Sequence, residues 1–261
     1  MKLKYLTILL AIFLAGCVAT QDYEMQPDRD IIFQTSTVNA ILEGFYDGIL
    51  TYGEVKKNGD FGIGTFEGLD GEMIALDNEF YQIKADGVAY EVKDSQETPL
   101  VVVTFFDDDR KIMLKGDVDF ETLSEYVDKA IPTKNIFYAI RIDGKFSYVR
   151  TRSVPKQEKP YPPLVEVTRN QPEFEFNDTV GTIVGFRTPE YANGINVPGY
   201  HLHFINEERT AGGHLLEFNI KDPVVAIDYT YDLHMVLPRD EEFYKLDLAE
   251  DKSEELEEAE K

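Results

Sequence analysis

Three of the four histidines in this sequence lie in the segment Gly199–His214, which reads Gly-Tyr-His-Leu-His-Phe-Ile-Asn-Glu-Glu-Arg-Thr-Ala-Gly-Gly-His. Side chains alternate faces along a strand, so we expect His201 and His203 to project from the same side. The glycine pair before His214 predicts a turn or bulge, which would let the chain double back and bring His214 across from the first two. Three neutral imidazoles that converge in this way suit Zn²⁺ and leave a coordination position for water or substrate. The segment therefore predicts a catalytic metal site rather than a structural one.

The fourth histidine, His234, lies in Tyr-Asp-Leu-His-Met-Val, outside this cluster. A histidine on a strand is usually packed or solvated, and an isolated His-x-His pair would be weak evidence for a metal. The clustering of three histidines carries the interpretation, whereas His234 is predicted to be a sheet residue and not a ligand.

The composition limits the class of protein. The chain has 261 residues, of which 43% are hydrophobic, enough for a sizeable core in one large or two modest domains. The formal net charge of −23 argues against a nucleic-acid-binding protein, because phosphate binding needs clustered Lys and Arg. Cys17 is the only cysteine, so an intrachain disulfide is excluded and stability must come from the core.

The N-terminal segment is typical of an export signal. Lys2 and Lys4 precede the apolar run 6–14, and Leu14-Ala-Gly-Cys17 resembles a bacterial lipobox. We expect residues 1–16 to be a lipoprotein signal peptide, cleaved so that the Cys17 thiol is lipidated. The protein would then be an extracytoplasmic, membrane-anchored bacterial lipoprotein. The alternative is a simple cleaved signal peptide in which the cysteine is incidental.

Short apolar runs separated by Gly, Asn and Asp predict a β-rich α+β fold with mixed or antiparallel sheets in two sheet-based halves and few short helices. Residues 17–34 are predicted to be a polar tether and 35–154 an N-terminal β-rich domain. A helix is expected after Asp119 and before Pro132, and a turn at 143–144 between two strands. The Pro-rich segment 155–163 is the predicted connector, and 164–261 the predicted C-terminal metal-binding β domain with an acidic tail.

Further motifs are spread along the chain: Gly64–Met73, Phe137–Phe146, Arg150–Arg152, Arg187–Tyr191, Val197–Phe204 and Gly212–His214. With these motifs the chain resembles the acetolactate decarboxylases from about residue 35 to the end. The family converts 2-acetolactate to acetoin and CO₂ with a bound zinc ion.

The resemblance implies roles for individual residues. It implies that His201, His203 and His214 are zinc ligands. It also places Glu72 and Arg152 at the active site, with Arg152 facing the substrate, and makes Thr65 a substrate-contacting residue. A tail glutamate would return to the metal, and Glu260 fits best by register, although Glu254, Glu255, Glu257 and Glu258 are alternatives. Without the resemblance, Glu72 would read as a solvated turn residue, Arg152 as an exposed strand end and the tail as disordered.

Two other functions fit parts of the pattern. His201, His203 and Glu207 imitate the first metal motif of a cupin oxygenase, but His214 follows too soon after Glu207 for that fold. An acidic, tethered chain would also attract cations, as a non-enzymatic metal-binding surface lipoprotein would. For the decarboxylase, the expected partners are the small-molecule substrate and a membrane reached through the lipid anchor only. A homodimer is compatible with the sequence, and no nucleic acid is expected.

Overall fold

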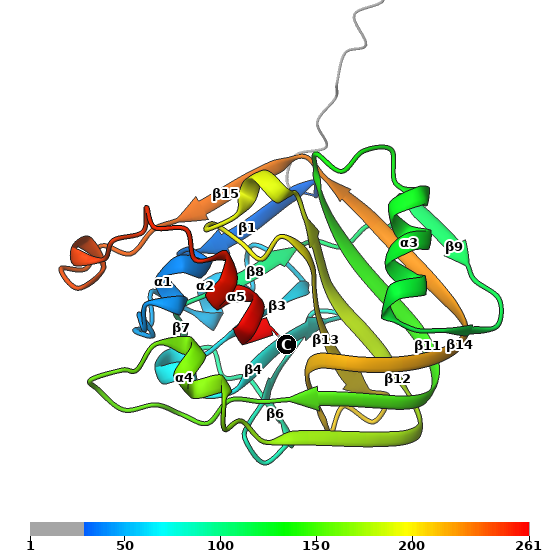
Figure 1. Ribbon diagram of the computed structural model, residues 1–261, viewed down its shortest axis with the longest axis horizontal. Coiled ribbons are helices and arrows are strands. Elements are labelled where there is room, and N and C mark those ends of the chain that lie inside the picture. The colour runs from blue at the N-terminus through cyan, green and yellow to red at the C-terminus, as the bar shows by residue number, and fades with distance from the viewer. Residues whose placement is uncertain (1–28, 261) are drawn as a thin grey trace, which may run out of the picture.

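The computed structural model describes residues 29–260, and two large sheets dominate this part of the chain (Figure 1). The first sheet has seven strands in the order β15 (Asp232–Val236), β1 (Ile31–Thr35), β8 (Val101–Thr104), β3 (Phe61–Thr65), β4 (Glu72–Leu76), β5 (Glu79–Ile83) and β6 (Ala89–Glu91). The second contains β10 (Asp117–Val118), β14 (Gly212–Thr230), β11 (Phe137–Arg152), β12 (Glu173–Thr188) and β13 (Gly199–Asn206), with β9 (Arg110–Met113) paired to β14. A small pair joins β2 (Leu50–Thr51) to β7 (Glu97–Thr98). The β-rich α+β class is as predicted.

The helices are short: α1 (Val38–Leu42), α2 (Tyr52–Val55), α3 (Phe120–Ala130), α4 (Leu164–Thr168) and α5 (Ser253–Glu260), with 3₁₀ turns η1 (Glu67–Leu69), η2 (Glu190–Ala192) and η3 (Phe243–Lys245). The longest, α3, begins as predicted, because the Asp119 carboxylate accepts a hydrogen bond of 2.9 Å from the Thr122 N–H. It ends at Ala130, and the capping residue Ile131 has the extended backbone that is favoured before proline.

The strands β11 to β14 pair in a closed circuit. β11 pairs with β12 and β14, and β13 pairs with the same two strands. β11, β12 and β14 are long enough to bend through this circuit, as the curled ribbons in Figure 1 show. Each strand therefore has its register fixed by two neighbours along part of its length.

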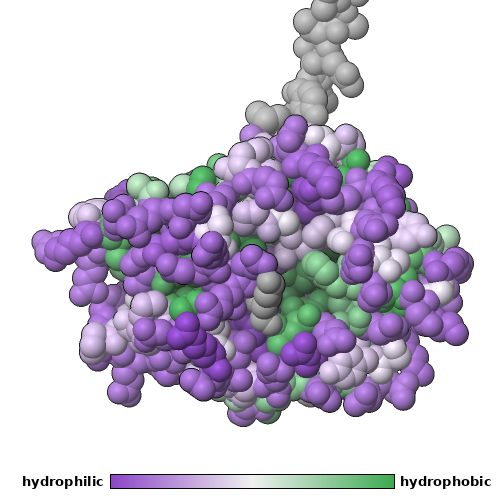
Figure 2. All heavy atoms as spheres, viewed as in Figure 1, coloured by the Kyte–Doolittle hydropathy of each residue, from purple (hydrophilic) through white to green (hydrophobic). Residues whose placement is uncertain are grey.

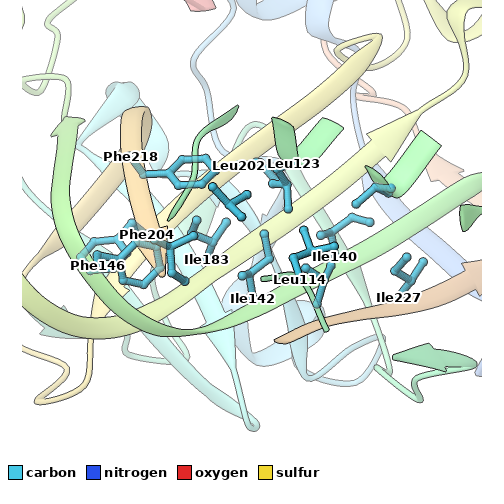
Figure 3. Packing of buried hydrophobic residues seen from close by; sticks show 14 of the residues in the cluster. Leu114, Leu123, Ile140, Ile142, Phe146, Ile183, Leu202, Phe204, Phe218 and Ile227 are labelled. Carbon is cyan, nitrogen blue, oxygen red and sulfur yellow. The ribbon is translucent and has the colours of Figure 1, made fainter. Parts of the chain in front are cut away.

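Alternation along β11 directs its side chains to two separate cores. Tyr138, Ile140 and Ile142 belong to the hydrophobic cluster that packs beneath α3, around Leu123 (Figure 3). Phe137 and Ala139 belong instead to the cluster between the two large sheets. Both faces of this strand are buried, so a register slip of one residue would exchange the two sets.

A third cluster joins the short helices to one end of the sheets. It contains Ile41 of α1, Leu164 of α4, and Leu256 and Ala259 of α5. Leu256 is 5% exposed and Ala259 fully buried, while Glu254, Glu255, Glu257 and Glu258 of the same helix are exposed. The acidic tail is therefore a docked amphipathic helix and not a solvated segment.

The predicted tether 17–34 ends too late. Residues 31–35 form β1, which pairs with β15 and β8, and Ile32 and Phe33 are buried. The apolar run Ile31-Ile-Phe33 has enough apolar surface to join a sheet, although the residues before it are mostly polar. Residues 1–28, including the predicted signal peptide and Cys17, lie outside the described part of the chain.

The predicted boundary at 155–163 does not separate the two sheets. β11, which precedes it, pairs along its length with β12 and β14, which follow it. β15, near the end of the chain, pairs with β1 at the edge of the other sheet. Proline-rich composition marks an extended segment, but it does not reveal which strands pair across it.

The predicted turn at 143–144 is also wrong. β11 runs through both positions, and Gly144 pairs with Gly181 of β12. On the β14 side the register shifts between Asp143 and Lys145, which is the sign of a bulge. Gly144 packs closely against the Ile220 side chain, since a Cβ there would lie 2.7 Å from Ile220 Cδ1, and no hairpin forms at this position.

Candidate active site

The three histidines of the 201–214 segment converge on the face of β13 that looks toward the seven-stranded sheet. Leu202 and Phe204 point to the opposite side, into the cluster beneath α3. His214 of β14 lies directly opposite His203 in the strand pairing. The ring centroids are 5.1 to 5.3 Å apart, and one ring nitrogen from each histidine lies within 4.8 Å of the others. The predicted convergence is confirmed.

The turn that returns the chain lies earlier than the sequence suggested. It falls between β13 and β14, around Arg209, whose φ is +56°. Gly212 and Gly213 are already part of β14. They serve close approach instead: a Cβ on Gly212 would lie 2.1 Å from the Phe204 carbonyl oxygen.

Burial keeps all three imidazoles neutral. Desolvation is the main cause that lowers the pKa of His201 and places the pKa values of His203 and His214 well below the ordinary value. His203 Nδ1 lies 3.0 Å from the Met73 carbonyl oxygen, so in the neutral ring this nitrogen carries the proton and donates. His203 Nε2 then carries a free lone pair, and this atom is buried and has no hydrogen-bond partner. A metal ligand held by a backbone carbonyl has this arrangement, and the residues fit a zinc ion.

Glu72 approaches the histidines from the other sheet. It begins β4, directly opposite Thr65 of β3, and is 7% exposed. Its Oε2 lies 3.6 Å from His203 Nε2, and its Oε1 lies 3.7 Å from Arg152 Nη1. Burial raises the pKa of Glu72 to about 7, although Arg152 acts in the opposite direction. The carboxyl group is therefore poised between its charged and neutral forms, and a bound cation would favour the charged form.

Arg152 ends β11, where it pairs with His214 across to β14. It is 4% exposed, and its Nη2 donates a hydrogen bond of 2.7 Å to the Ala259 carbonyl oxygen in the last turn of α5. Carbonyls at a helix C-terminus have no partner within the helix, and a cation there is favourable. Its Nε is buried with no hydrogen-bond partner. The guanidinium thus faces the site with unused donor capacity.

Glu260 reaches the site from the end of α5. Its Oε2 lies 3.8 Å from His201 Nε2 and 3.7 Å from His214 Nε2. A cavity of about 60 Å³ lies beside these groups, and Thr65, Glu72, Arg152 and Glu260 line it with two of the histidines. The Thr65 hydroxyl donates to the Gly71 carbonyl oxygen at 2.7 Å, which leaves the hydroxyl oxygen as an acceptor.

Comparison with known proteins agrees with this geometry. The family described as Alpha-acetolactate decarboxylase matches residues 32–250. The alpha-acetolactate decarboxylase of Methylococcus capsulatus is 51% identical over 229 residues, covering 88% of each chain. This chain belongs to the alpha-acetolactate decarboxylase family. The crystal structure of the Bacillus subtilis strain 168 enzyme superposes with a TM-score of 0.86 at 43% identity, covering 88% of this chain and 99% of that one.

The site brings together every residue that was predicted from the resemblance to this family: Thr65, Glu72, Arg152, His201, His203, His214 and Glu260. It excludes others. His234 lies on β15, packed edge-on against Phe33, as expected of a sheet residue. Glu207 of the cupin-like pattern is exposed in the turn after β13.

Sequence reasoning missed two groups that hold the site. One is the Met73 carbonyl, which fixes the His203 tautomer. The other is Gln171, whose Oε1 accepts a hydrogen bond of 2.9 Å from Arg152 Nη1. Neither position carries a distinctive residue pattern, because both act through tertiary contacts.

A second hollow reaches the site from the surface. It is lined by Phe120, Leu215, Leu216 and Phe218 and ends at His214 and Glu260. Figure 2 shows apolar residues gathered in a hollow on the face where α5 ends, within an otherwise polar surface. Glu260, at the end of α5, lines both the cavity and this hollow.

Proposed function

We propose that this chain catalyses the zinc-dependent decarboxylation of 2-acetolactate to acetoin and CO₂. The observation that carries the proposal is the convergence of His201, His203 and His214 beside Arg152 and Glu72 at one buried cavity. The chain's membership of the alpha-acetolactate decarboxylase family supports the same reaction.

Zinc fits the donor set. Three neutral imidazole nitrogens suit a borderline-soft dication, and a three-histidine site leaves room for substrate. A bound zinc ion would supply a Lewis acid for the ketone and hydroxyl oxygens of the substrate. Glu72 and Glu260 add carboxylates beside the ligands, so the site has negative charge available to offset the dication.

Arg152 binds the carboxylate that leaves. A guanidinium stays charged at any working pH and can donate two parallel hydrogen bonds to a carboxylate. Arg152 lines the cavity, and its Nε has no hydrogen-bond partner within the protein, so the guanidinium keeps donor capacity for a ligand. Fixing the carboxylate in this way holds the bond between it and C2 in position to break.

The electron pair of that bond flows into the neighbouring ketone as CO₂ leaves, and C2 must then receive a proton. Glu72 is placed to deliver it, because its buried carboxyl group lines the cavity beside Arg152 and His203. Replacing Glu72 with Gln is expected to leave zinc content close to one ion per chain and to lower kcat by about 100-fold or more. Unchanged turnover in that variant would remove Glu72 from the mechanism.

The proposal is tested by incubating the purified protein with 2-acetolactate, with and without a chelator, and measuring acetoin. Acetoin should form faster than by spontaneous decay, stop after chelation and return when zinc is added. Metal uptake and release without acetoin formation would instead identify a metal-binding protein. No acetoin above the spontaneous rate refutes the proposal.

We propose that the protein is an extracytoplasmic lipoprotein anchored to a membrane through its N-terminal segment. Among residues 29–260, no helix is long and apolar enough to cross a membrane. Lipidation of Cys17 is the proposed anchor, and the motif Leu14-Ala-Gly-Cys17 supports it. Replacing Cys17 with Ser should move the protein from the membrane fraction to the soluble fraction. Sedimentation of that soluble variant would also measure whether the chain forms a homodimer.

A further inference from the structure

We propose that Gln171 is a positioning residue that fixes the Arg152 guanidinium for the substrate carboxylate. The inference rests on the proposed decarboxylase function and adds a residue to it. Gln171 lies in the loop between α4 and β12, and it does not line the 60 Å³ cavity. Its effect on the reaction must therefore pass through Arg152.

Two acceptors hold the two terminal nitrogens of the guanidinium. Arg152 Nη1 donates to Gln171 Oε1 at 2.9 Å, and Nη2 donates to the Ala259 carbonyl oxygen at 2.7 Å. The nearest carboxylate oxygen, Glu72 Oε1, is 3.7 Å from Nη1 and beyond hydrogen-bond distance. The contacts that orient the guanidinium are therefore made by neutral groups.

Neutral acceptors suit this task. A carboxylate at the position of Gln171 would pair with the guanidinium and offset the charge that the substrate carboxylate needs. An amide oxygen orients the planar guanidinium and leaves the full charge of the guanidinium available to the substrate. The arrangement predicts that the neutrality of residue 171 matters as much as its ability to accept a hydrogen bond.

The loop that carries Gln171 is held in place. The Gln171 N–H donates to the Thr168 carbonyl oxygen at 3.3 Å, and Val167 of α4 packs in the cluster that includes α1 and α5. Two residues later, Glu173 begins β12 and pairs with Arg152 in the strand register. Position 171 is thus fixed relative to Arg152 through backbone contacts on both sides, and the side chain has only a short distance to bridge.

The test uses Gln171→Ala, Gln171→Glu and the control Gln157→Ala. Gln157 is a half-buried loop glutamine whose side chain donates to the Pro155 carbonyl oxygen, away from the guanidinium. For each purified holoenzyme we would measure zinc content, kcat, KM for 2-acetolactate, and inhibition constants for 2-hydroxy-2-methylpropanoate and acetoin. The first inhibitor carries the carboxylate, and acetoin does not.

Gln171→Ala should raise KM and the inhibition constant of the hydroxy acid by about 10-fold, the loss expected for one hydrogen bond to a charged group. Zinc content and the acetoin inhibition constant should stay at the wild-type values, and Gln157→Ala should match wild type throughout. Gln171→Glu keeps the acceptor but should weaken carboxylate binding more than Gln171→Ala does. A purely structural role predicts the reverse, since glutamate preserves the contact.

Three results overturn the inference: an unchanged KM in Gln171→Ala, equal weakening of acetoin and the hydroxy acid, or wild-type kinetics in Gln171→Glu. Failure of the proposed function looks different, because the wild-type protein itself would then produce no acetoin.

Discussion

Replacing Gly213 with Ala should disturb the site by forcing β14 away from β11. Gly213 has a φ of +143°, pairs with Phe204 of β13 and directly precedes His214. A Cβ there would be 2.4 Å from the Arg152 carbonyl oxygen and 3.2 Å from the Thr151 Cβ. The nearest obstacle is backbone, which cannot rotate away as the end of a flexible side chain could. β14 would have to move away from β11 at the point where Arg152 and His214 are paired.

The loss of stability expected for Gly213→Ala has two parts. A non-glycine residue at positive φ costs roughly 1–2 kcal/mol, and overpacking by one methyl group typically adds about 1–3 kcal/mol. Substitution of Gly116 measures the cost of positive φ without overpacking, because its φ is +86° and nothing lies within 4 Å of its Cβ position. We therefore expect Gly116→Ala to lower the free energy of unfolding by about 1–2 kcal/mol and Gly213→Ala by roughly 2–5 kcal/mol.

Urea denaturation of the zinc-loaded proteins measures both values, and zinc content and KM report on the site. Gly213→Ala should also bind zinc more weakly and raise KM, because His214 and Arg152 flank the displaced backbone. Gly116→Ala should leave both unchanged. If the two variants lose equal stability and both keep full zinc content, the close approach of β14 to β11 does not hold the site together.

Two further predictions concern α5 and the buried carboxyl group of Asp228. Removing residues 253–261 takes away Glu260 and the Ala259 carbonyl that accepts from Arg152. The kcat/KM for 2-acetolactate should therefore fall by about 100-fold. Kinetics equal to wild type would show that the helix is dispensable. Burial raises the pKa of Asp228 to about 8, with Asp109, Asp30 and Asp107 adding to the effect. The folded state then holds a proton that the unfolded state releases above about pH 4, so stability falls as the pH rises from about 4 to 8. Asp228→Asn cannot ionise, and urea denaturation at pH 5.5 and 8 should show wild type losing about 1–3 kcal/mol more than this variant; equal losses would contradict the assignment.

The parts of the site that follow local periodicity could be predicted from the sequence. Alternation along a strand is enough to place His201 and His203 on one face. The helix after Asp119 follows from its cap and from Pro132. Each of these depends on neighbours within a few residues.

The parts that depend on strand pairing could not be predicted in the same way. Asp143-Gly144 has the composition of a hairpin turn, yet β11 passes through it because β12 and β14 both continue alongside. No local sequence pattern marks Gln171, because its partner Arg152 is far from it in the sequence. Burial of Glu72 requires the second sheet to cover it, and no residue near Glu72 in the sequence reports that covering.

The closed circuit of β11 to β14 explains how a dispersed set of residues can form one rigid site. His203 and His214 face each other across one pair of strands, and His214 and Arg152 across the next. A slip of one residue in β13 would turn His201 and His203 into the apolar cluster beneath α3 and bring Leu202 and Phe204 to the cavity. That exchange would bury two imidazoles among hydrocarbon side chains and remove two ligands together. Because β13 pairs on both sides, the same hydrogen bonds that build the sheet also exclude this alternative, and the geometry of the histidines is a property of the strand register before any metal is bound.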